Sequence, residues 1–234
     1  MRVDNQPAYI LHQRPFRDTS QILEVFTKDF GRLSIMSRGS RGPKSRLKNI
    51  IQPFRALVVN WSGRGEMPTL TGAEPASQGV AFLQGKSLAC ALYINELIMY
   101  LTYKHDVHDQ LFSQYHHTVN CLIETDKLEQ ALRQFEFNML ENLGVSLDLT
   151  HDAKTGDKLN EGAEYYFQLE SGFSELNRSS DAPGGPVVSG SSLLEISQGR
   201  FETEKTLKDA KHLMRYIISH YLGGKSLKSR ELFR

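Results

Sequence analysis

The sequence predicts an α+β protein in which a small five-stranded β-barrel precedes a bundle of helices. Two observations support this prediction. Apolar residues recur with a period of two in short runs within residues 1–80 and with a helical period in four segments within residues 81–234. Positive charge is also concentrated in the first of these ranges. A chain of 234 residues is long enough for one compact unit or two small ones.

Five short runs rich in β-branched and aromatic residues predict the strands of the barrel. Turn residues such as Asp29 and Gly31 separate neighbouring runs at hairpin-like spacing. The predicted strands span residues 8–14, 20–27, 31–38, 53–62 and 66–73. Five antiparallel strands in a segment this short suit a barrel of the OB-fold type, although an SH3-like barrel has a similar sequence signature.

Four amphipathic segments follow, each with apolar residues at helical spacing. They span residues 82–103, 107–123, 128–143 and 205–222. Each needs the apolar faces of the others, which predicts a helical domain over residues 81–234. A polar insert at about residues 148–200 interrupts it, with a possible hairpin formed by residues 163–169 and 172–176.

Several classes of protein are excluded by what the chain lacks. No apolar run approaches the roughly 20 residues that cross a bilayer, and Met1–Pro7 lacks the apolar stretch of a signal peptide. We therefore expect a soluble, cytoplasmic protein without a membrane partner. Cys90 and Cys121 are far apart in sequence, which predicts free thiols and no disulfide framework.

The sequence also lacks the motifs of the common enzyme and metal sites. The histidine pairs His105/His108 and His116/His117 have no third ligand at a recognisable spacing. Gly224-Lys225-Ser226 lacks both the first glycine and the preceding strand of a P-loop. We expect no catalytic residue, no cofactor and no metal site.

The strongest signal is the distribution of charge. Residues 1–80 carry 12 Lys and Arg against 6 Asp and Glu, whereas the remaining residues carry 16 against 21. No acid lies between Asp29 and Glu66, although eight basic residues do: Arg32, Arg38, Arg41, Lys44, Arg46, Lys48, Arg55 and Arg64. Uncompensated positive charge predicts a polyanionic partner such as nucleic acid. The alternative is a solvated loop whose charges only favour solubility.

We predict that phosphates are contacted by cations of the barrel and of its basic loop, residues 39–49. These cations are Arg14, Arg32, Arg38, Arg41, Lys44, Arg46 and Lys48. Arg14 and Arg17 could instead pair with Asp18 and Glu24. Three aromatic residues could stack on bases if they are exposed, namely Phe30, Phe54 and Trp61, although Phe54 and Trp61 fit the barrel core as well.

The C-terminal tail is also rich in cations. Lys225, Lys228 and Arg230 are candidate contacts for DNA or for a partner protein. They are equally explained as cations that follow the C-terminus of a helix.

Seven strings in this sequence together resemble the RecO family of bacterial recombination mediators, in the right order and over nearly the whole chain. They are Ala8–Ser20, the turn from Phe26 to Arg32, Arg38–Arg41, Gln52–Phe54, Tyr93–Leu97, Leu132–Glu136 and Leu222–Arg230. The resemblance implies an N-terminal OB-fold and a helical domain. In many relatives the insert holds zinc through four cysteines. Residues 151–173 contain no cysteine, so we expect a zinc-free insert held by packing.

The resemblance also implies a function and a set of partners. Members of the family bind single- and double-stranded DNA, anneal complementary strands, contact the acidic C-terminal tail of the single-strand-binding protein and, with RecR, help to load RecA. They are not enzymes in the usual sense. An interaction scaffold that does not touch DNA and a nuclease are the competing classes.

The tail of the single-strand-binding protein ends in apolar residues and a carboxylate, and such a peptide needs an apolar groove with a cation at its rim. The resemblance places this groove in the helical domain. The candidate residues are Arg133, Leu132, Leu140 and Leu143, although the leucines fit the bundle core as well.

Overall fold

The computed structural model describes residues 1–76, 83–124, 126–176 and 184–233. The chain divides into two compact units. Unit 1 comprises Met1–Asp126 and Leu227–Arg234, and unit 2 comprises Lys127–Ser226. The change from strands to helices therefore lies inside unit 1.

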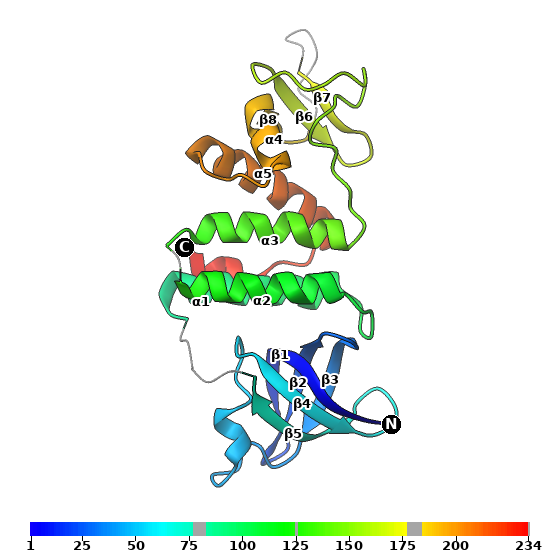
Figure 1. Ribbon diagram of the computed structural model, residues 1–234, viewed down its shortest axis with the longest axis vertical. Coiled ribbons are helices and arrows are strands. Elements are labelled where there is room, and N and C mark those ends of the chain that lie inside the picture. Colours follow the sequence, from blue (N-terminus) through cyan, green and yellow to red (C-terminus); the bar gives the residue numbers. More distant parts are fainter. Residues whose placement is uncertain (77–82, 125, 177–183, 234) are drawn as a thin grey trace. The chain divides into compact units, whose positions relative to one another are not determined.

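Unit 1 begins with a closed five-stranded barrel (Figure 1). Its strands are β1 (Arg2–Phe16), β2 (Ser20–Thr27), β3 (Gly31–Ser37), β4 (Leu57–Ser62) and β5 (Thr69–Pro75). The strands neighbour one another in the order β1-β2-β3-β5-β4, and β1 pairs with both β2 and β4 to close the barrel. Only the β3–β5 contact is parallel among these pairs. The OB-fold prediction is confirmed.

The first strand is longer than predicted because it borders two partners. Its first half pairs with β4 and its second half with β2, and its register against β2 shifts between Ile10 and His12. Such an irregularity bends a strand and lets it turn a barrel corner. The barrel interior is filled by side chains from all five strands and from the loop after β3: Val3, Ala8, Ile10, Leu23, Val25, Leu33, Ile35, Ile51, Leu57, Val59, Trp61, Leu70 and Ala73.

Two helices of unit 1 follow the barrel, α1 (Gly85–Leu101) and α2 (Asp109–Glu124), and confirm two of the predicted segments. The predicted start at Phe82 lies outside the described residues. Outward-facing aromatic residues of the barrel pack on α2: the ring centroids of Tyr9 and Phe26 lie 5.8 and 5.5 Å from that of Phe112. The C-terminal 3-10 helix η2 (Lys228–Phe233) packs against α1.

Unit 2 contains three helices and a small sheet in its described part. The helices are α3 (Leu128–Asn142), α4 (Gly190–Ser197) and α5 (Glu204–Tyr221), and the strands are β6 (Glu164–Gln168), β7 (Gly172–Glu175) and β8 (Val187–Ser189). Helices α3 and α5 and the β6–β7 hairpin confirm the predictions. Strand β8 and helix α4 were not predicted, and residues 177–183 of the insert lie outside the described residues.

No helix in the described ranges is both long and apolar enough to cross a bilayer.

Candidate nucleic-acid interface

The basic loop after β3 is held on the barrel by its own apolar residues. Within it, the short 3-10 helix η1 (Arg46–Asn49) carries Arg46 and Lys48 on either side of Leu47, and Ile50 and Ile51 follow it. Leu47 and Ile50 pack against the barrel core, and Ile51 is buried in it. Arg46 and Lys48 are exposed. The local pattern therefore presents the cations to solvent from a fixed backbone.

The start of the loop is joined to the turn between β1 and β2. The backbone N–H of Arg41 donates to the carbonyl of Thr19 at 2.8 Å, and its guanidinium donates to the carbonyl of Arg17 at 3.3 Å. Arg17 is exposed beside this contact. The acidic residue Asp18 follows it in the same turn. Sequence reasoning did not assign Arg17 to the interface, because only the tertiary contact brings the two turns together.

Six of the seven predicted phosphate contacts are exposed, and we call them the cationic surface. Its members are Arg14, Arg38, Arg41, Lys44, Arg46 and Lys48. None of them forms an ion pair with another described residue. Their positive charge is therefore available to a polyanion.

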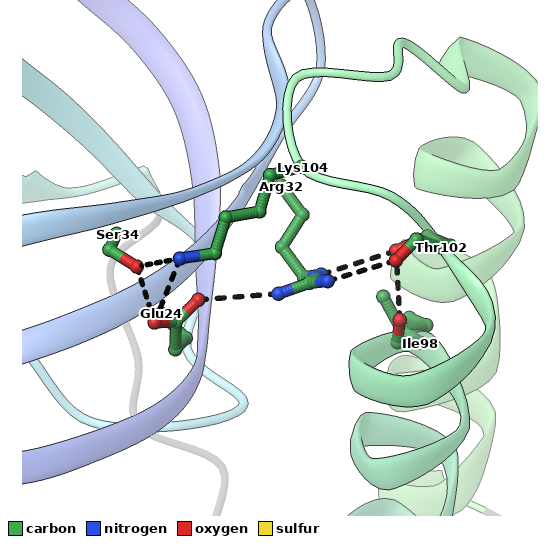
Figure 2. A network of polar contacts seen from close by, with 6 residues as sticks. All are labelled: Glu24, Arg32, Ser34, Ile98, Thr102 and Lys104. Carbon is green, nitrogen blue, oxygen red and sulfur yellow. Dashed lines mark hydrogen bonds and ion pairs between the residues drawn. The ribbon is translucent and has the colours of Figure 1, made fainter. Parts of the chain in front are cut away.

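Arg32 is the exception, and its assignment as a phosphate contact is corrected. Only 8% of the residue is exposed. Its guanidinium lies 3.4 Å from the carboxylate of Glu24 and donates to the carbonyl of Thr102 at 2.9 Å (Figure 2). Burial lowers the pKa of Arg32, and the charge of Glu24 partly offsets this effect. A guanidinium enclosed in this way has no face left for DNA.

Glu24 is the centre of this network and is itself only 9% exposed. It accepts a hydrogen bond from Ser34 at 2.5 Å, and the ammonium of Lys104 lies 3.7 Å away (Figure 2). The suggested pairing of Arg14 or Arg17 with Glu24 is therefore wrong. The network instead joins β2 and β3 to the end of α1 within unit 1.

The aromatic residues that sequence suggested for base stacking are not well placed for it. Trp61 is 3% exposed and packs in the barrel with its ring centroid 5.3 Å from that of Phe30. Phe54 and Phe30 are half-buried. The barrel core is thus the principal role of Trp61.

The residues predicted to bind an acidic tail lie on or just after α3. Leu132 and Leu140 are 6% and 2% exposed, so they belong to the core and offer little surface. Leu143 is half-buried. Arg133 is 5% exposed, and its guanidinium lies 2.9 Å from the carboxylate of Glu136. Its Nε has no hydrogen-bond acceptor in the part of the chain that the structure describes.

Comparison with known proteins decides the family. A family model described as "Recombination protein O N terminal" matches residues 1–78, and one described as "Recombination protein O C terminal" matches residues 83–231. The chain belongs to the RecO family. A protein from Azoarcus sp. (strain BH72) named "DNA repair protein RecO" is 40% identical over 234 residues, covering 100% of this chain and 96% of its own length. A protein of the same name from Methylococcus capsulatus is 41% identical, covering 97% and 91%.

In this RecO-family chain, the string Tyr93–Leu97 serves to hold unit 1 together. The side-chain amide of Asn95 donates to the carbonyl of Leu11 at 2.8 Å and accepts from the hydroxyl of Tyr115 at 2.6 Å. These buried bonds join β1, α1 and α2. Because a buried amide that lost them would be left unsatisfied, they also select one orientation of the helices on the barrel.

The neighbouring Glu96 holds the C-terminal tail. Its carboxylate accepts from the backbone N–H groups of Lys228 and Ser229, each at 2.9 Å. The tail is therefore folded against α1 and is not a free basic arm. The side chains of Lys225 and Lys228 are exposed, whereas Arg230 is half-buried.

The insert lacks the four cysteines that a zinc site of the kind expected from the family resemblance would need. It has no cysteine between residues 151 and 173, and no group of three His, Cys, Asp or Glu that could hold a metal occurs among the described residues. Asp152 organises the turn instead. Its carboxylate accepts from the backbone N–H groups of Lys154 and Glu175, each at 2.7 Å, and from that of Thr155 at 3.1 Å. The insert is thus held by a buried carboxylate as well as by packing.

Proposed function

We propose that this chain acts in DNA repair and homologous recombination by binding single- and double-stranded DNA and annealing complementary strands. The observation that carries the proposal is the cationic surface, whose charges are exposed and are not neutralised by described acids of the chain. Membership of the RecO family supports it.

The mechanism follows from the charge of the two strands. Bringing two phosphate backbones together is opposed by their repulsion, and cations that displace condensed counterions lower that barrier. Contacts to phosphates leave the base edges free to pair and carry no sequence information. The chain then favours annealing without choosing a sequence and without a catalytic residue.

The partners in this role follow the family resemblance. We propose that the chain contacts the acidic C-terminal tail of the single-strand-binding protein and, with RecR, helps to load RecA. For the tail we retain Arg133 as the candidate cation. Its Nε–H group is buried and has no acceptor among the described residues, so a carboxylate of the peptide would satisfy it only after the residues that cover it move.

Reversing two charges tests the DNA proposal. We expect R38E/R41E to weaken DNA binding roughly tenfold and to slow annealing, because two phosphate contacts become repulsive. The free energy of unfolding should change by less than about 1 kcal/mol, since both side chains are exposed. The measurements are oligonucleotide titration at two salt concentrations, strand annealing and urea unfolding.

The matched control is R200E/R215E, which makes the same change in net charge with exposed arginines of unit 2. We expect it to bind DNA nearly as the unmodified chain does. Equal losses in both variants would show an effect of net charge alone. Binding by the unmodified chain that ignores salt would favour the interaction scaffold.

A further inference from the structure

Tyr103 is the most exposed large hydrophobic side chain in the described part of the chain, at 81%. It lies in the loop between α1 and α2. A single exposed apolar residue is common and needs no explanation by itself. The backbone that carries Tyr103 and the position of its neighbours distinguish this side chain from other exposed apolar residues.

The loop is fixed to the barrel on both sides of its turn. The N–H of His105 donates to the carbonyl of Arg32 at 2.8 Å, although His105 has the left-handed φ of +64° that a non-glycine residue rarely adopts. A Cβ on Gly31 would lie 2.0 Å from the carbonyl oxygen of Asp106, so the loop packs directly on the β2–β3 turn. Tyr103 is therefore presented from a preorganised backbone.

The loop also borders the barrel face that leads to the cationic surface. The ammonium of Lys104, next to Tyr103, bonds Ser34 at 2.5 Å on the outer face of β3. Continuing along β3 from Ser34, the next outward side chain is Met36, roughly 7 Å away, and Arg38 follows in the turn after the strand ends at Ser37. The loop that carries Tyr103 bridges Arg32 at the start of β3, and Arg38 follows the end of the same strand, roughly 20 Å farther along it.

The neighbouring strands place an arginine on this face. Arg14 of β1 pairs in register with Ile22 of β2, which pairs with Met36 of β3. Residues paired in this way point to the same side of a sheet. Arg14 therefore lies on the same outward face as Ser34, at the level of Met36.

We propose that Tyr103 is a stacking platform for an unpaired base of a single strand whose phosphates lie on the cationic surface. This inference rests on the proposed DNA binding and extends it. Aromatic stacking tolerates any base, because every base has a π-face. A base inside a duplex is already stacked on its neighbours. The charges of the cationic surface do not distinguish single strands from duplexes. Tyr103 would therefore add a preference for single strands.

A tryptophan reporter tests the contact directly. The chain has one tryptophan, Trp61, and it is buried in the barrel. In Y103W, we expect single-stranded oligonucleotide to quench the added fluorescence in a saturable manner, at the same concentrations at which it binds. Duplex of equal length should quench it much less. Unchanged fluorescence at saturating single strand would overturn the proposal.

Affinity provides the second measurement. We expect Y103A to bind single strands roughly fivefold or more weakly and duplexes as the unmodified chain does, whereas Y103F keeps the ring and the affinity. Y221A, which removes a half-exposed tyrosine of unit 2, is the matched control. Equal loss on both DNA forms, or none in Y103A, contradicts the stacking role.

These outcomes separate the inference from the function on which it rests. If the unmodified chain binds no DNA, the proposed function and the stacking role of Tyr103 both fail. If R38E/R41E loses binding while Y103A and Y103W respond as the unmodified chain does, the function stands and the platform fails.

Discussion

At the scale of single residues, Arg32 contributes to stability rather than to DNA binding. It lies on the outer face of β3, where a polar or charged side chain is usual when nothing covers the strand. The end of α1 covers it, and the guanidinium then bonds Glu24 and Thr102. Removing one partner of a buried ion pair leaves the other charge uncompensated.

We therefore expect R32M to destabilise the chain by about 3–5 kcal/mol, because among the described residues Glu24 then keeps only the more distant Lys104 as a counter-charge. Urea unfolding measures the change. R14M is the matched control, since Arg14 is exposed and unpaired among described residues, and it should cost less than about 1 kcal/mol. If R32M unfolds at the same urea concentration as R14M, the network does not stabilise unit 1.

At the scale of an element, the insert depends on Asp152. Burial alone would raise the pKa of this carboxyl, but hydrogen bonds from Glu175, Lys154 and Thr155 outweigh it and lower the pKa below the ordinary value. The ionised form is therefore favoured in the folded insert. Its contribution is present above the ordinary pKa of about 3.9 and is lost as the pH falls through the lowered value.

We expect D152A to reduce the protection of the backbone amides of β6 and β7 against hydrogen exchange, by about 1–3 kcal/mol in opening free energy. The control is D157A, which removes an exposed carboxylate from the same turn. Urea unfolding of unit 1 should not change in either variant. Protection that is unaffected by D152A would show that packing alone holds the insert.

The elements themselves were predicted unevenly, for physical reasons. The predictions for long segments with a strong apolar period are confirmed. The helix predicted over 128–143, for example, is observed as Leu128–Asn142. Strand β8 was missed because it has three residues, too few to establish a period of two. Helix α4 was missed because its eight residues begin Gly-Ser-Ser, a string typical of a loop. Ser189 starts this helix by accepting from the N–H of Ser192.

At the scale of the whole molecule, the two units differ in charge. Unit 1 carries 17 Lys and Arg against 12 Asp and Glu, and unit 2 carries 11 against 15. The sequence predicted a segregation of charge between residues 1–80 and the rest of the chain, and six of its seven predicted phosphate contacts are exposed. It did not predict the burial of Arg32 or of Arg133, because both depend on what packs over a strand or helix and not on local spacing. For the same reason, no pattern in the sequence indicated Tyr103.

The charge difference predicts that binding of DNA and of the acidic tail can be lost separately. R38E/R41E should weaken DNA binding and leave the affinity for a peptide with the acidic, apolar C-terminus of the single-strand-binding protein unchanged. R133M should weaken binding of this peptide and leave the affinity for DNA unchanged. E136Q should bind the peptide at least as tightly as the unmodified chain, because Arg133 loses a competing carboxylate.

Added salt should weaken DNA binding more than peptide binding, since the net charge of unit 2 does not attract an acidic peptide over long range. Fluorescence anisotropy of labelled DNA and labelled peptide measures both affinities, and urea unfolding identifies variants that fail to fold. A folded R133M that binds the peptide normally would remove Arg133 from that site.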